Sequence, residues 1–125
     1  MRLRVLGFEL AVDEFGTGSM AADQLARVAF NALKIRRDFV SPKGKAKAGW
    51  AHLAAALDTA RQLKLVAVAD GIQTPDDWNL LQELQCHLGQ GPLISSPLPG
   101  AAVAQWLQTW PPRAQRGVWT PMPML

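Results

Sequence analysis

Short apolar segments alternate with longer helical patterns four times along the chain. The segments with strand-like character are residues 8–12, 32–35, 65–69 and 87–89, of which the last is the weakest in strand propensity. Each is followed by a stretch in which apolar residues recur every three or four positions, which is typical of an amphipathic helix. This alternation predicts an α/β protein with about four βα units and parallel strands.

The helical stretches have apolar stripes, and one has a well-marked start. Helices are predicted from about residue 21, over residues 50–63 with Trp50 among the core-facing positions, and over residues 101–110. Another begins after Thr74, which can cap the helix, and is followed by a proline that suits the first turn. Two aspartates then meet the positive end of the helix dipole.

We expect one domain over residues 1–110 and an irregular, proline-rich tail over residues 111–125. Glu9 interrupts the short apolar run near the start, which therefore lacks the form of a signal peptide. No apolar run reaches the length that crosses a membrane. The single cysteine, Cys86, excludes an intrachain disulfide and fits a reducing compartment. These features predict a cytoplasmic protein without a membrane partner.

The formal net charge of +3 at pH 7 is compatible with an anionic ligand. The basic residues are dispersed, apart from Lys43, Lys45 and Lys47 in a polar loop predicted over residues 41–49. A nucleic-acid surface requires denser clustering. We therefore expect no nucleic-acid partner.

Polar residues recur where predicted strands end: Asp13, Glu14, Lys34, Asp70 and Gln90. In parallel α/β folds this rim is where ligands bind and chemistry occurs. For any one of these residues taken alone, a solvated loop charge or a helix cap is the commoner role. Their shared position makes the rim the candidate site.

Cysteine and tryptophan do not identify a second site. Cys86 has no accompanying histidine and acid in a recognisable local signature, and we expect it to be a buried structural residue. Trp50, Trp78, Trp106 and Trp110 are expected in the core or at an interface.

Four segments in order resemble the motifs of EAL-type cyclic-di-GMP phosphodiesterase domains. Residues 7–18 read GFELAVDEFGTG, which is similar to the family's GF-apolar-DDFGTG segment, and residues 33–40 read LKIRRDFV, similar to LKIDRSFV. Residues 68–74 read VADGIQT, similar to VAEGVET, and residues 90–99 read QGPLISSPLP, similar to QGYLFSRPLP. The resemblance extends over about residues 3 to 110.

This resemblance implies a (β/α)8 TIM-type barrel that hydrolyses cyclic-di-GMP with Mg or Mn. A whole barrel of this kind needs about 250 residues. The resemblance therefore predicts a partial barrel, made of the family's last four βα units, with residues 1–6 as the end of the helix before them.

The resemblance also assigns roles to the rim residues. Asp13 and Glu14 would be the paired carboxylates that bridge the metals, as suits hard divalent ions. Lys34 would stand beside the attacking water and the phosphate. Asp70 takes the place of a glutamate with metal-linked or base chemistry, and Gln90 that of a glutamine lining the same site.

If the resemblance holds, the departures from the family pattern would all weaken catalysis. Glu14 replaces aspartate and Asp70 replaces glutamate, so each carboxylate is displaced by one methylene group. Gln73 replaces a second glutamate, Arg36 stands where the family has aspartate, and Pro92 replaces an aromatic residue. The namesake Glu-Ala-Leu motif and the early asparagine and glutamate ligands have no counterpart here.

We therefore expect a degenerate, truncated EAL-like module of bacterial signalling that is non-catalytic by itself and binds a partner chain or cyclic-di-GMP. A homodimer, or a partner protein that completes the barrel, would cover its open sheet edges. The alternative is part of an active metal-dependent phosphodiesterase completed by another chain or by dimerisation. A third possibility, with no ligand at all, is a gene remnant or an alternative fold that keeps the βα pattern for packing.

Overall fold

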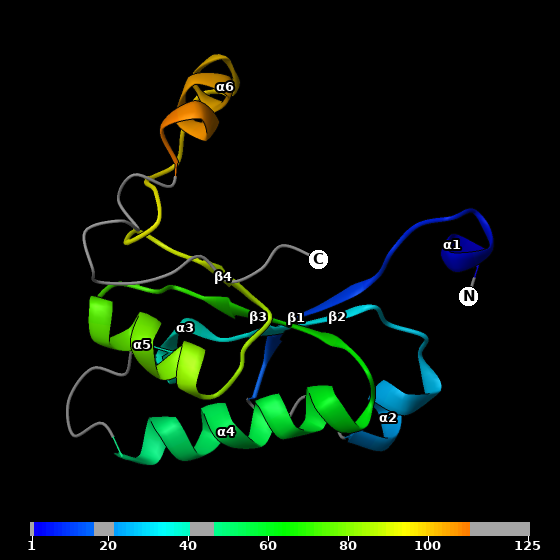
Figure 1. The fold of residues 1–125 in the computed structure, drawn as a ribbon. Helices are drawn as coiled ribbons and strands as arrows, with labels where there is room; N and C mark the ends of the chain where they lie inside the picture. The colour runs from blue at the N-terminus through cyan, green and yellow to red at the C-terminus, as the bar shows by residue number, and fades with distance from the viewer. Residues whose placement is uncertain (1, 17–21, 41–46, 111–125) are drawn as a thin grey trace.

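The computed structural model describes residues 2–16, 22–40 and 47–110, which form alternating helices and strands (Figure 1). In chain order these are α1 Arg2–Val5, β1 Ala11–Phe15, α2 Ala22–Arg27, β2 Ala32–Ile35, α3 Arg37–Val40, α4 Lys47–Gln62, β3 Val66–Asp70, α5 Pro75–Glu83, β4 Leu88–Gln90 and α6 Gly100–Thr109. The alternation predicted from the sequence is confirmed.

The described strands form one four-stranded sheet in the order β1-β2-β3-β4, and each neighbouring pair is parallel. Each strand therefore pairs with the next along the chain, and helices make the return connections, as in a βα barrel. The strands and their helices confirm the predicted α/β class with four βα units. β1 and β4 are the two edges of this sheet.

Burial alternates along the central strands. Leu33, Ile35, Ala67 and Ala69 are completely buried on one face, which α4 and α5 cover in Figure 1. The core under these helices also contains Leu25, Val40, Leu53, Ala56, Leu57, Ala60, Leu65, Ile72, Trp78, Leu81 and Cys86. Residues between the buried ones in β2 and β3 are only partly buried, and none of the described helices covers the opposite face in Figure 1. Within the described residues, the sheet is thus packed on one side and open on the other.

The start of α5 shows how local sequence fixes an element. The side-chain oxygen of Thr74 accepts a hydrogen bond from the Asp77 amide at 3.1 Å, and the Asp77 carboxylate accepts one from the Thr74 amide at 2.9 Å. This reciprocal capping box satisfies amides that the helix itself leaves without partners. The predicted helix start after Thr74 is confirmed.

Some sequence-based boundaries were wrong. β1 covers residues 11–15, not 8–12, so Asp13 and Glu14 lie within the strand. α4 begins inside the predicted loop 41–49, and the Trp50 side chain is 42% exposed instead of facing the core. The predicted tail over residues 111–125 lies outside the described residues. Over the described ranges, no helix has both the length and the apolar character needed to span a bilayer.

Backbone hydrogen bonds continue the β3–β4 pairing beyond the strands. The Ile72 amide donates to the Gln90 carbonyl at 3.0 Å, and the Leu93 amide donates to the Ile72 carbonyl at 3.1 Å. Gly91 lies between these bonds, where a Cβ atom would come within 2.3 Å of both the amide nitrogen and the carbonyl oxygen of Ile72. Only glycine allows the two backbones to approach this closely.

We predict that Gly91→Ala lowers the free energy of unfolding by about 2 kcal/mol, because the added methyl group forces the two backbone segments apart. Gly100→Ala is the matched control, since a Cβ atom there meets nothing within 4 Å. The control should change stability by less than about 1 kcal/mol. Chemical denaturation followed by circular dichroism measures both, and equal losses in the two variants would contradict this account.

Candidate functional site

Two carboxylates lie at an irregularity in β1. The pairing of β1 with β2 shifts register between Val12 and Phe15, and Glu14 has a φ of 51°, which is uncommon for a residue with a side chain. Val12 and Phe15 both pack against the core, although residues three apart in a regular strand face opposite sides. This bulge leaves Asp13 and Glu14 adjacent and exposed, with the Glu14 amide donating to Oδ1 of Asp13 at 2.8 Å.

Lys34, Asp70 and Gln90 come together at the carboxyl ends of their strands. Asp70 pairs in register with Gln90, and Lys34 pairs with Val68, two residues before Asp70 on the same face. Nζ of Lys34 lies 3.7 Å from Oδ2 of Asp70, and these side chains are 27% and 35% exposed. At this distance the two groups attract each other as charges without a hydrogen bond. The sheet register thus gathers three of the residues that the sequence predicts for the site.

A divalent metal needs more oxygen ligands than the described residues bring together. Hard ions such as Mg and Ca take six or more ligands, several of them oxygens held by the protein or substrate. In the part of the chain that the structure describes, no group of three or more His, Cys, Asp or Glu side chains could hold an ion. Asp13 and Glu14 form only a pair, and Asp70 faces Lys34. These residues do not fit a two-metal centre, and no metal-dependent step follows from them.

Arg36 places a cation where the family resemblance implies a carboxylate. Its guanidinium donates a hydrogen bond to Oδ2 of Asp38 at 2.7 Å. This bond, with Coulomb attraction to Asp38 and Glu14, raises the pKa of Arg36 against the smaller opposing effect of desolvation. The attraction to Glu14 is the smallest of these effects, so Asp38 is the main partner of this cation.

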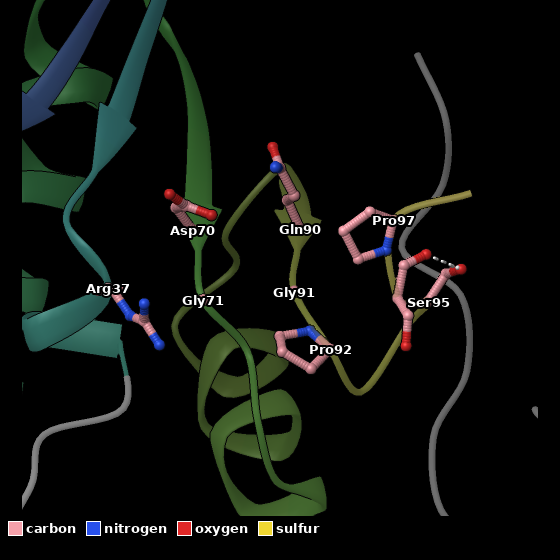
Figure 2. Close-up of a pocket in the computed structure, with 9 residues that line it drawn as sticks. Arg37, Asp70, Gly71, Gln90, Gly91, Pro92, Ser95 and Pro97 are labelled. Atoms are coloured by element: carbon pink, nitrogen blue, oxygen red, sulfur yellow. Dashed lines mark hydrogen bonds between the residues drawn. The ribbon is translucent and has the colours of Figure 1, made fainter. Parts of the chain in front are cut away.

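A pocket of about 390 Å³ opens beside Asp70 and Gln90. Figure 2 shows Arg37 approaching from one side, and the loop after β4, with Ser95 and Pro97, on the other. The strand ends between them supply carboxylate and amide groups. The pocket thus combines one guanidinium, short polar groups and apolar proline walls, which suits a small ligand that is both polar and planar.

Arg37 is a site residue that the sequence patterns do not identify. Gly71 has a φ of +80°, and a Cβ atom there would lie 2.4 Å from Cβ of Arg37, so glycine is what lets Arg37 reach the pocket wall. Arg37 forms no ion pair within the described ranges. A glycine directly after each of the strand-end residues Asp70 and Gln90 is the sequence signal that could have indicated this close approach.

Cys86 does not contribute a reactive thiol. It is buried, and its Sγ lies 3.4 Å from the Leu88 carbonyl oxygen. Burial raises the pKa of the Cys86 thiol, and the nearby backbone hydrogen bonds oppose this rise only in part. A protonated, enclosed thiol is a poor nucleophile. The expectation that Cys86 is a buried residue is confirmed.

We predict a small coupling energy between Lys34 and Asp70, because both side chains are partly exposed and the charges are 3.7 Å apart. A double-mutant cycle with Lys34→Met and Asp70→Asn should give less than about 1 kcal/mol. The more exposed pair Arg61 and Asp58 is the matched control and should give less still. A coupling of several kcal/mol would show that Lys34 is committed to Asp70 and is not available to a ligand.

Known proteins resemble this chain over most of its length. The family model described as EAL domain matches residues 1–97. The chain is 38% identical over 109 residues to cyclic di-GMP phosphodiesterase NbdA of Pseudomonas aeruginosa. This alignment covers 87% of this chain and 14% of that protein. It is 37% identical over 106 residues to the probable cyclic di-GMP phosphodiesterase PdeN of Escherichia coli, covering 85% of this chain and 20% of that protein.

Solved structures have the same fold. The PaMucR phosphodiesterase in its c-di-GMP complex matches with a TM-score of 0.78 and 30% identity, over 82% of this chain and 41% of that chain. The EAL domain of Mycobacterium smegmatis DcpA matches with a TM-score of 0.78 and 30% identity, over 86% of this chain and 48% of that chain. This chain thus spans a small part of the curated relatives and less than half of these solved chains.

The described fold is a partial TIM-type barrel like the corresponding part of these EAL domains. The motif order, the parallel sheet and the family match over residues 1–97 agree. The chain therefore belongs to the EAL domain family.

Proposed function

We propose that this chain acts in cyclic-di-GMP-related signalling in the bacterial cytoplasm as a degenerate EAL module that binds a ligand or a partner chain and does not catalyse by itself. One observation carries this proposal. The rim keeps Lys34, Asp70 and Gln90 beside a pocket, whereas the described carboxylates form no group of three that could hold a metal. These observations support a chain that binds a ligand at the rim without a complete catalytic centre of its own.

The pocket chemistry suits a cyclic dinucleotide. A phosphodiester carries negative charge, which Arg37 and Lys34 would attract, and a guanidinium binds phosphate oxygens in a fixed, paired geometry. Gln90 and Ser95 offer hydrogen bonds, and the prolines offer an apolar wall for a planar base. The relative NbdA is a cyclic di-GMP phosphodiesterase and PdeN is a probable one, which supports this ligand class.

The altered carboxylates support binding without turnover. Glu14 and Asp70 keep the family charge with a changed side-chain length, and a misplacement of about 1 Å can cost about 100-fold in rate. Binding by charge attraction tolerates such a displacement, because it falls off gradually with distance. The same changes therefore reduce catalysis far more than they reduce ligand binding.

We predict that calorimetric titration detects cyclic-di-GMP binding with similar affinity in the presence and absence of Mg or Mn, and that chromatography of the mixture detects no linear product. Arg37→Ala should weaken binding at least about tenfold, because it removes a charge-assisted hydrogen bond. Arg27→Ala is the matched control, since Arg27 is exposed at the end of α2, where the chain turns toward the start of β2. No binding under either condition would contradict the ligand part of this proposal.

A second candidate function is catalysis in an assembly, with this chain supplying late-strand residues of an active phosphodiesterase. The adjacent exposed carboxylates Asp13 and Glu14 favour it, because paired carboxylates are what a divalent metal requires. If another chain or a second copy completes the barrel and hydrolysis is found, Asp13→Asn should reduce it by at least about 100-fold. Asp58→Asn, on the exposed side of α4, is the control, and activity that survives Asp13→Asn would rule out this site.

A further inference from the structure

The segment after β4 is unusually free of charge for an exposed part of a protein. Residues 88–110 contain no Asp, Glu, Lys or Arg. They include α6, which has no buried residue and stands away from the sheet in Figure 1. Val103 and Leu107 on this helix are 39% and 57% exposed. A helix surrounded by water normally carries a polar, charged face, whereas loss of charge is typical of the centre of a protein interface.

The opposite end of the sheet carries a second apolar patch. α1 and the residues that follow it precede the other edge strand, β1, and α1 lies far from α6 in Figure 1. The exposed apolar side chains there are Leu3, Val5, Leu6 and Phe8, with Val5 at 87%. We call this set the α1 patch, and Leu98, Val103 and Leu107 the α6 patch. Of the eight exposed large hydrophobic side chains in the described ranges, seven belong to these two patches.

Both edges and the open face of the sheet need to be covered by another part of a protein. β1 and β4 each have one side without a strand in the described sheet, and such edges readily pair with another strand. The face turned away from α4 and α5 is only partly buried at Ala32, Val66 and Val68. Parallel sheets are almost always covered on both faces. Whatever covers this sheet must therefore reach both edges and the open face together.

We infer that two copies of this chain close into one barrel, with β1 of each copy beside β4 of the other and with the α1 patch of each against the α6 patch of the other. This inference rests on the proposed function and names the partner chain. β1 and β4 run in the same direction, so a two-fold axis along the barrel joins them in parallel. Four strands from each copy make the eight of a βα barrel.

A second copy is the occupant that this geometry favours. Each chain carries both apolar patches at opposite edges of its sheet, so two copies satisfy all four patches with no other chain. Pairing two β1 edges or two β4 edges would run antiparallel, and would leave the other patch exposed. A head-to-tail interface that closes after two units gives a finite dimer and no further edges.

Closure would also complete the rim. Because the strands remain parallel, the carboxyl ends of all eight strands lie at one end of the barrel. Gln90 at the end of β4 would then stand near the partner's Asp13 and Glu14, which lie in the second half of β1. Each site would thus contain the exposed carboxylate pair of one copy and the pocket of the other.

Light scattering in line with size-exclusion chromatography, without nucleotide, tests the dimer directly. The expected mass is twice that of the 13.6 kDa chain. A mass of one chain at micromolar concentration would overturn the inference. Because no nucleotide is present, a failure of cyclic-di-GMP binding does not affect this result, and a monomer that binds the nucleotide would overturn the dimer alone.

Two charge variants test how the copies meet. Val5→Lys alters the α1 patch and Leu107→Glu alters the α6 patch, and each should weaken dimerisation at least about tenfold by placing an unpaired charge in both interfaces. Trp50→Glu is the matched control, because Trp50 is also exposed but lies on α4, away from both sheet edges. All three side chains are exposed, and circular dichroism confirms that the variants fold.

Mixing the two variants gives the sharpest result. A mixed dimer has one unaltered interface and one in which lysine meets glutamate, so the dimer should reappear when Val5→Lys and Leu107→Glu chains are combined. In a dimer that is formed by α6 of both copies alone, Val5→Lys would not weaken dimerisation. Mixing would not return the Leu107→Glu chain to a dimer. Either a dimeric Val5→Lys chain or a mixture that stays monomeric would overturn the inference.

Discussion

The register of the parallel sheet is the constraint on which both the core and the rim depend. Leu33 and Ala67 face the covering helices in β2 and β3, while Lys34 in the next position faces the open side. A shift of one residue would bury the lysine and expose the leucine, so the burial of one face fixes the register. The same pairing that builds the core therefore brings Lys34 and Asp70 within 3.7 Å of each other.

Positive side chains lie beside the carboxylates of the rim, and they oppose metal binding in addition to the small number of metal ligands. The segment that leaves β2 carries three cations, and two of them act on carboxylates of neighbouring strands. Lys34 attracts Asp70, and Arg36 lies in the field of Glu14. A metal would have to compete with these fixed cations for the same oxygens. An arginine at position 36 thus adds a positive charge beside the carboxylates of the rim.

The sequence predicted most of the fold because the βα pattern repeats, and the second strand was placed at residues 32–35 without error. β1 was misplaced because period-two reasoning assumes a regular strand, and the positive φ of Glu14 marks a bulge. The prediction that Trp50 faces the core was wrong, because helical spacing shows which residues share one face of a helix but not how far the core extends beneath that face. Lys34 could be assigned to the rim because the ends of parallel strands meet at one edge of the sheet. Arg37 could not, because it reaches the pocket only by packing against Gly71, which is distant in sequence.

The incomplete site and the incomplete packing have one physical origin. In a βα barrel the site is assembled from loops at the ends of many strands, and the same strands cover one another's edges. The four described strands therefore supply only part of such a rim and leave two sheet edges unpaired for the same reason. α6, which follows the edge strand β4, carries no charged residue and exposes Val103 and Leu107. In a closed barrel, strands that cover these edges would also add groups to the rim, so the geometry of the sheet would couple association to ligand binding.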